Sequence, residues 1–175
     1  MILSNSNFKF ENTNLTNIRI LFGLIISSTG SIDKLLVENM DTRAAMNFRD
    51  CYSITIRNSE YDTMYRGLAS IFATDTHFEE ISNVKFHNIS LTNCILLRNS
   101  HISLIQNATF ENIRIGIEMS DSSGSIINNI NVTRDTSSLA SDSWQAINLY
   151  DSNITIQNST FINNSNDKGG AIYIQ

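Results

Sequence analysis

The chain has 175 residues and a formal net charge of −5, and 41% of its residues are hydrophobic, which is enough for one domain with a continuous core. Only 12 residues are Lys or Arg, so the composition excludes the basic footprint of a nucleic-acid-binding protein. The sequence holds 26 Ile, 23 Asn and 23 Ser but no Pro. Because Ile favours strands, Asn and Ser favour turns, and Pro interrupts paired strands, we expect an all-β protein.

The longest apolar stretch of the chain covers residues 18–26. It is too short to span a bilayer and it contains Arg19, so we expect no membrane-spanning segment. The N-terminus lacks a basic region followed by a small-residue cleavage site, and these residues therefore give no sign of a secretion signal.

A repeat of about 24 residues runs through the chain. The segments 77–88 (HFEEISNVKFHN) and 101–112 (HISLIQNATFEN) align without a gap, and residues 1–12 align with both. Looser copies begin at Gly30, Ser53, Gly124 and Asn153. A second strand is expected in each repeat, over residues 19–26, 44–48, 67–72, 94–97, 115–119, 146–149 and 170–174. Repeats of this length are single supersecondary units that bury their apolar faces by stacking.

Two columns of the aligned repeats indicate how the coils stack. The first column is apolar and contains Phe10, Val37, Ile56, Phe86, Phe110, Val132 and Phe161. The second lies two residues later and contains Asn12, Asn39, Asn58, Asn88, Asn112, Arg134 and Asn163. Parallel strands stack at about 4.8 Å, and like residues then lie above like residues. We therefore predict a single-stranded right-handed parallel β-helix of about seven coils over residues 1–175, with the Phe and Asn columns forming an internal ladder.

A helical repeat is the main alternative at this period. The frequent β-branched residues, the short alternating runs and the scarcity of Ala, Leu and Lys argue against it.

The coil pattern resembles the right-handed β-helix superfamily typified by pectin-lyase-like proteins, over nearly the whole chain. The last coil, Phe161 to Asn164 followed by Gly169 to Ile172, also resembles the FxxN and GGAI repeats of polymorphic outer-membrane adhesins. The Ile-rich and Asn-rich coils are similar to large surface proteins of ciliates and other protists. These resemblances imply an extracellular or cell-surface protein with a structural or adhesive role. We expect an internal fragment of a longer solenoid, or a fibre subunit that stacks end to end on like copies.

A carbohydrate-binding or polysaccharide-cleaving protein is the alternative that the same resemblance offers. The related polygalacturonases carry NTD, DD, GHG and RIK motifs, and none of these occurs in the sequence. Glycoside hydrolysis needs two carboxyl groups that face each other across one bond. The adjacent acids Glu79 and Glu80 lie in one strand, where neighbours are expected to point to opposite faces. We therefore predict no catalytic residues, no cofactor and no enzymatic activity.

His77 and His101 occupy the same column in adjacent coils, so their side chains are expected about 5 Å apart. Asp75 and Asn99 lie two residues before them. Histidines with a carboxylate can hold a transition metal, but zinc needs three or four well-placed ligands. A polar turn ladder gives the same sequence pattern, and we predict no metal site.

The two cysteines, Cys51 and Cys94, are expected in second strands two coils apart, about 10 Å along the axis. A disulfide needs Cα atoms within about 7 Å, so we predict buried free thiols. The coil 124–153 is about five residues longer than the others, and residues 136–144 are expected to project as a loop that ends at Trp144. Residues 61–65 are expected to form another turn.

Seven N-x-S/T sequons are present, at Asn14, Asn88, Asn107, Asn131, Asn153, Asn158 and Asn163. Strand parity relative to the Phe column predicts that Asn107, Asn131 and Asn158 face outward. With Asn153 and Asn14 they are the candidate glycosylation sites. Asn88 and Asn163 share the parity of the Phe column and are expected in the internal ladder.

Overall fold

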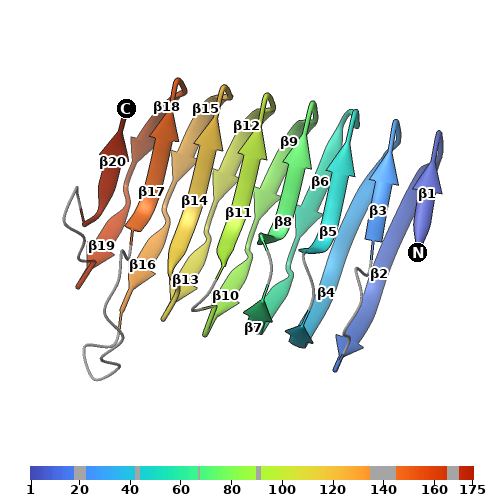
Figure 1. The fold of residues 1–175 in the computed structure, drawn as a ribbon, viewed down its shortest axis with the longest axis horizontal. Helices are drawn as coiled ribbons and strands as arrows, with labels where there is room; N and C mark the ends of the chain where they lie inside the picture. The colour runs from blue at the N-terminus through green and yellow to red at the C-terminus, as the bar shows by residue number, and fades with distance from the viewer. Residues whose placement is uncertain (18–22, 42–43, 67, 90–91, 135–144, 165–169) are drawn as a thin grey trace.

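The protein is a parallel β-solenoid of about six turns. The computed structural model describes residues 1–17, 23–41, 44–66, 68–89, 92–134, 145–164 and 170–175. Strands stack side by side along one axis, and no helix occurs in the described residues (Figure 1). The predicted all-β parallel solenoid is confirmed, and the predicted number of coils is close to the observed one.

Two hydrogen-bonded sheets build the walls of the solenoid, and all their strand pairs are parallel. The first sheet has the order β1 (Ile2–Ser4), β3 (Gly23–Ile26), β5 (Ala44–Arg49), β8 (Ala69–Thr74), β11 (Asn93–Arg98), β14 (Ile115–Ser120), β17 (Gln145–Tyr150) and β20 (Ile172–Ile174). The second sheet contains β2 (Asn7–Thr16), β4 (Thr29–Asp41), β6 (Ile54–Arg57), β7 (Glu60–Arg66), β9 (His77–Ser82), β10 (Lys85–His87), β12 (His101–Gln106), β13 (Thr109–Glu111), β15 (Ser123–Asn128), β16 (Asn131–Thr133), β18 (Asn153–Gln157) and β19 (Thr160–Ile162).

Each coil has three faces and three corners. The long strand β4 pairs with β6 through its first half and with β7 through its second half, so the second sheet covers two faces. Corner A joins the first sheet to the second, as between β8 and β9; corner B separates β9 from β10; and corner C follows β10. The core lies between the three faces as one continuous apolar cluster.

An aromatic ladder forms the centre of this core. Tyr61 pairs with Phe86, and Phe86 pairs with Phe110. Their ring centroids lie 5.0 and 5.1 Å apart, with interplanar angles of 11° and 6°. The same column continues through Val132 to Phe161, which is partly buried. Phe86 and Phe110 are fully buried in the core, and Phe161 packs against it. Tyr61 belongs to β7 and is fully buried, so the prediction that it lies in a turn is wrong.

Phe10 lies inside but in a different column from the one predicted. It pairs with Ile32, which pairs with Ile56, and Ile56 pairs with Ile81. The alignment of residues 1–12 with 77–88 was wrong, because Asn7, and not Met1, occupies the position equivalent to His77. Corners B and C both place an Asn two residues after an apolar strand residue, so the ends of two faces look the same in sequence.

The Asn residues predicted for the internal ladder lie at the corners, outside the core. Five of them are exposed and Asn112 is half-buried, and their φ angles are between 50° and 58°: Asn12, Asn39, Asn58, Asn88, Asn112 and Asn163. A positive φ turns the chain sharply at a corner, and Asn and Asp tolerate it better than other non-Gly residues. Of the 21 described non-Gly residues with positive φ, 13 are Asn and four are Asp, which accounts for much of the Asn-rich composition.

Replacing Tyr61 with Phe should raise the free energy of unfolding by about 1 to 3 kcal/mol, the cost of a buried polar group without a partner. Its hydroxyl is buried and has no hydrogen-bond partner among the described residues. Urea denaturation followed by circular dichroism measures the change. An unchanged or lower stability would show that the hydroxyl has a partner that stabilises the folded state.

Candidate functional site

A shallow, open groove follows corner A along the solenoid axis, with a volume of about 860 Å³. Four coils each contribute three successive residues to it: one with a left-handed backbone, one with a small hydroxyl side chain, and one at the start of the next strand. The four coils that line most of the groove contribute residues 75–77, 99–101, 121–123 and 151–153. Because these coils are in register, the groove is built from three parallel rows of polar side chains.

The outer row consists of Asp75, Asn99, Asp121 and Asp151, whose φ angles lie between 44° and 50°. All four are exposed. The amide Nδ2 of Asn99 donates a hydrogen bond to Oδ1 of Asp75. The row therefore carries three carboxylates and one amide along the edge of the groove.

The floor of the groove is a ladder of buried hydroxyls. Ser100 Oγ donates to the carbonyl of Arg98 at 2.7 Å and accepts the backbone N–H of Thr76 at 3.2 Å. Ser122 repeats the pattern one coil later, with the N–H of Ser100 at 3.1 Å. Each hydroxyl thus links two coils, and the floor is rigid because its polar atoms are paired.

Cys51 occupies a position in this hydroxyl ladder. Its backbone N–H donates to Thr76 Oγ1 at 3.3 Å, and its Sγ lies 3.2 Å from the carbonyl oxygen of Arg49. Burial raises the pKa of the Cys51 thiol, and it raises that of Cys94 as well. Both cysteines are buried and free, as predicted. Cys51 lies at corner A and not in a strand, unlike the expectation.

Replacing Ser100 with Ala should lower the free energy of unfolding by about 1 to 3 kcal/mol, because the buried N–H of Thr76 would lose its acceptor. Cys51→Ser is the matched control: it places a hydroxyl in the same ladder and should leave the stability unchanged or raise it. Chemical denaturation of both variants gives the comparison. Equal losses in the two variants would contradict a stabilising hydroxyl ladder.

The inner row begins with the exposed Tyr52 and continues with His77 and His101. The two imidazole centroids lie 4.8 Å apart at an interplanar angle of 79°, so the predicted proximity is confirmed. Oγ of Ser103 lies 3.2 Å from Nε2 of His77, and Oγ of Ser123 lies 2.8 Å from Nδ1 of His101. Within the described ranges, no group of three or more His, Cys, Asp or Glu is arranged to hold a metal ion.

The protonation of His101 should make the stability of the protein depend on pH. Partial burial lowers the pKa of His101, the charge of His77 lowers it further, and Glu79 opposes the shift. The unfolded chain then binds protons more readily than the folded one, so stability is lost as the pH falls through about 6.5 and below. The melting temperature of the native protein should therefore fall more between pH 7.5 and pH 5 than that of His101→Asn. Parallel curves for the two proteins would contradict this role.

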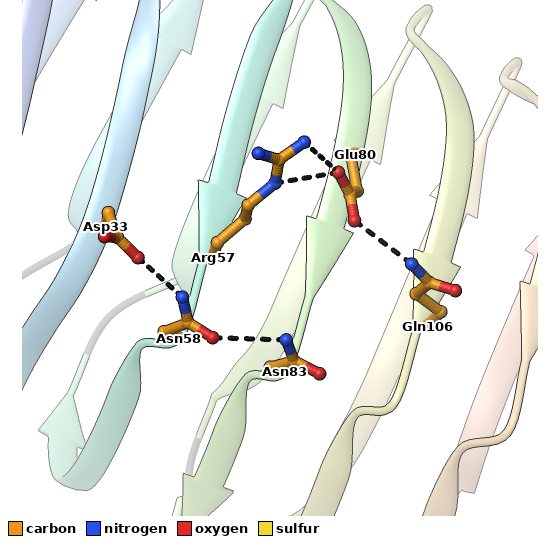
Figure 2. Close-up of polar contacts among 6 residues, drawn as sticks. All are labelled: Asp33, Arg57, Asn58, Glu80, Asn83 and Gln106. Carbon is orange, nitrogen blue, oxygen red and sulfur yellow. Dashed lines mark hydrogen bonds and ion pairs between the residues drawn. The ribbon is translucent and has the colours of Figure 1, made fainter.

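Corner B carries a second polar ladder, which lies on the outer surface (Figure 2). Asn58 Nδ2 donates to Oδ1 of Asp33 at 2.7 Å, and Asn83 Nδ2 donates to Oδ1 of Asn58 at 3.1 Å. Asn107 and Asn129 continue the chain of amides at 3.1 and 2.8 Å. Hydrogen-bonded Asn stacking therefore occurs at corner B, and Asn58 of the predicted ladder takes part in it. The recurrence of Asn83, Asn107 and Asn129 at one repeat position was the signal for this ladder.

Glu79 and Glu80 both lie on the outside of the solenoid, contrary to the expected opposite orientations. A register shift between β6 and β9 places two residues between the inward side chains of Phe78 and Ile81. Glu80 is held by Arg57 and by Nε2 of Gln106 at 3.1 Å (Figure 2). Burial tends to raise the pKa of Glu80, but hydrogen bonds from Ser82, Arg57 and Gln106 and the Arg57 charge lower it below its usual value.

All seven sequon asparagines are exposed, so the interior placement expected for Asn88 and Asn163 is wrong. Four side-chain amides are already engaged as donors: those of Asn88, Asn107, Asn158 and Asn163. The amides of Asn14, Asn131 and Asn153 have no side-chain hydrogen bond within the described part of the chain. The expected loop with Trp144 lies outside the described residues.

No family model, no curated protein and no solved structure matches this chain. Among the described residues, no helix is both long enough and apolar enough to cross a membrane.

Proposed function

We propose that this solenoid is a structural or adhesive protein of the cell surface or extracellular space, glycosylated and built into a filament of stacked coils. The observation that carries the proposal is the continuity of the inner columns, which run through every described coil. Such a stack is extended and rigid, because each coil is joined to its neighbours by backbone hydrogen bonds, apolar columns and side-chain ladders.

The outermost coils support stacking on further coils. At one end Ile2 is 70% exposed, and at the other end Ile174 is 70% exposed. Phe10, Ile154, Ile156 and Phe161, which continue buried columns, are only partly buried. Strands at the edge of a parallel sheet also present unpaired N–H and C=O groups. A like copy stacked on either end would bury these side chains and pair these groups.

The side walls support a surface role. The exposed sequons, above all Asn14 and Asn131 with their unpaired amides, leave room for glycans on the outside of the coils. We propose no catalytic role, because the adjacent acids are held in structural contacts: Glu79 accepts a hydrogen bond from Ser53, and Glu80 is bound by Arg57.

Expression through a eukaryotic secretory pathway tests the proposal. We expect sedimentation velocity and electron microscopy to show concentration-dependent rods, and glycopeptide mass spectrometry to show sugar on exposed sequons. Ile174→Asp should prevent rod formation, because it places a charge in an end face. Leu68→Asp is the control, since Leu68 is exposed at 46% on the wall between described coils. Equal assembly of the two variants, or a sugar-free monomer at all concentrations, would contradict the proposal.

A further inference from the structure

We propose that the groove at corner A binds a linear oligosaccharide that carries hydroxyl and amino groups but no carboxylates, with its long axis parallel to the solenoid axis. This binding lies on the side wall and requires no stacking at the end faces. Its failure would therefore leave the structural role untouched.

The shape of the groove favours a linear polymer. The groove runs across several coils, and each coil repeats the same three polar positions at the strand spacing of about 4.8 Å. A ligand with equivalent groups at a similar spacing can contact successive coils in the same way. A sugar ring with its linkage has about the length of one coil spacing, whereas an extended peptide advances only about 3.3 Å per residue. The repeat therefore fits an oligosaccharide better than a peptide strand.

The side chains of the groove match the chemistry of sugar hydroxyls. The carboxylates of Asp121 and Asp151 are exposed acceptors, and Oδ1 of Asn99 accepts as well because its Nδ2 is already bound to Asp75. On the opposite row, the amide of Asn153 has no side-chain partner within the described ranges, so it offers both donors and an acceptor. The hydroxyl floor between the rows is internally paired and stays in place without a ligand.

Tyr52 supplies an apolar surface at one end of the groove. Its side chain is 62% exposed, although large aromatic side chains usually bury most of their surface. The flat face of a pyranose ring carries C–H groups that can pack on an aromatic ring, while the phenol hydroxyl remains in water. A sugar unit placed against Tyr52 would continue along the rows toward Asp75, Asn99 and Asp121.

Charge decides which oligosaccharide fits. Among the residues that the structure describes, the lining includes the carboxylates of Asp75, Asp121 and Asp151 but no Lys or Arg. The lowered pKa of His101 leaves that imidazole neutral at pH 7. An oligomer of uronic acids would bring like charges against the outer row, which opposes binding, whereas ammonium groups would complement it. The groove therefore favours amino sugars first and neutral sugars second.

Isothermal titration calorimetry of the full chain with four probes tests this inference. The probes are a β-1,4-linked glucosamine pentamer, cellopentaose, a galacturonic acid pentamer and pentalysine. We expect the glucosamine pentamer to bind most tightly, cellopentaose to bind more weakly, and the galacturonic acid pentamer not to bind. The affinity for the glucosamine pentamer should fall with added salt, since it includes charge attraction.

Two variants separate the contributions within the groove. Asp121→Asn combined with Asp151→Asn should weaken binding of the glucosamine pentamer at least tenfold and change cellopentaose binding less. Asn tolerates the left-handed backbone at both positions, so the fold should be retained. Tyr52→Ala should weaken the binding of the glucosamine pentamer and the binding of cellopentaose to a similar extent. Glu38→Gln, which removes a carboxylate outside the groove, is the control and should change neither. The inference would be overturned if the galacturonic acid pentamer or pentalysine bound more tightly than the glucosamine pentamer. It would also be overturned if neither the glucosamine pentamer nor cellopentaose bound.

Discussion

Replacing Phe110 with Ala should lower the free energy of unfolding by about 3 to 5 kcal/mol, the usual cost of deleting a buried aromatic side chain. Phe110 is fully buried and stacks on Phe86 at 5.1 Å, with Val132 as its neighbour in the next coil. The backbone ladder fixes the distance between coils, so the neighbouring coils cannot close the space that the ring leaves. Urea denaturation followed by circular dichroism measures the loss.

Phe110→Leu provides the control for the cavity. Leu keeps most of the apolar surface but cannot stack, so we expect a loss well below that of Phe110→Ala. A loss below about 1 kcal/mol for the Ala variant would mean that the position is not in a packed core, where such truncations cost several kcal/mol.

Replacing Gly30 with Ala should lower the free energy of unfolding by about 2 to 6 kcal/mol, the sum of backbone strain and overpacking. Gly30 has a φ of 155°, which side-chain-bearing residues rarely adopt. A Cβ there would lie 2.3 Å from the carbonyl oxygen of Phe8 and 2.7 Å from its ring. Phe8 pairs directly with Gly30 across the first two coils, so its backbone would have to move.

Gly124 offers a matched control because it lies at the equivalent position of a later coil. A Cβ at Gly124 would meet Cδ1 of Ile154 at 2.7 Å, and that is the flexible end of a side chain. We therefore expect Gly124→Ala to cost less than about 1.5 kcal/mol, in the range of tolerated packing changes. A larger loss for Gly124→Ala than for Gly30→Ala would contradict the observed register of the first two coils.

The repeat length was enough to predict the fold, because a period of about 24 residues with β-branched strands leaves few alternatives to a parallel solenoid. The columns through Phe86, Phe110 and Phe161 follow directly from that period. The first coil was placed wrongly because β2 and β4 continue through a corner, so Phe10-x-Asn12 at corner B looks the same as Phe110-x-Asn112 at corner C.

The position of the Asn residues could not be read from strand parity. Strand parity assigns alternate residues to the inside and the outside of the coil, counting from the Phe column. A residue with positive φ interrupts this alternation and turns its side chain outward. Asn88 and Asn163 therefore lie on the surface although they share the parity of buried residues.

The groove at corner A was only partly visible in the sequence. The proximity of His77 and His101 follows from the period, and Asp75 and Asn99 lie two residues before them in the sequence. The extension to Asp121 and Asp151 was not predicted, because neither acid is followed two residues later by a histidine. Their positions two residues before Ser123 and Asn153 repeat those of Asp75 and Asn99 before the two histidines, and this spacing was the available signal.

The distance between spin labels on one outer column tests the stacked architecture most directly. Asn14, Lys85 and Thr160 belong to one column of the second sheet and are exposed. Cysteine substitutions at 14 and 85 span three coil spacings, about 14 Å, and those at 14 and 160 span six, about 29 Å. Cys51 and Cys94 are buried and should not take up the label. A parallel solenoid predicts that the second distance is about twice the first and narrowly distributed. Equal or broadly distributed distances would contradict it.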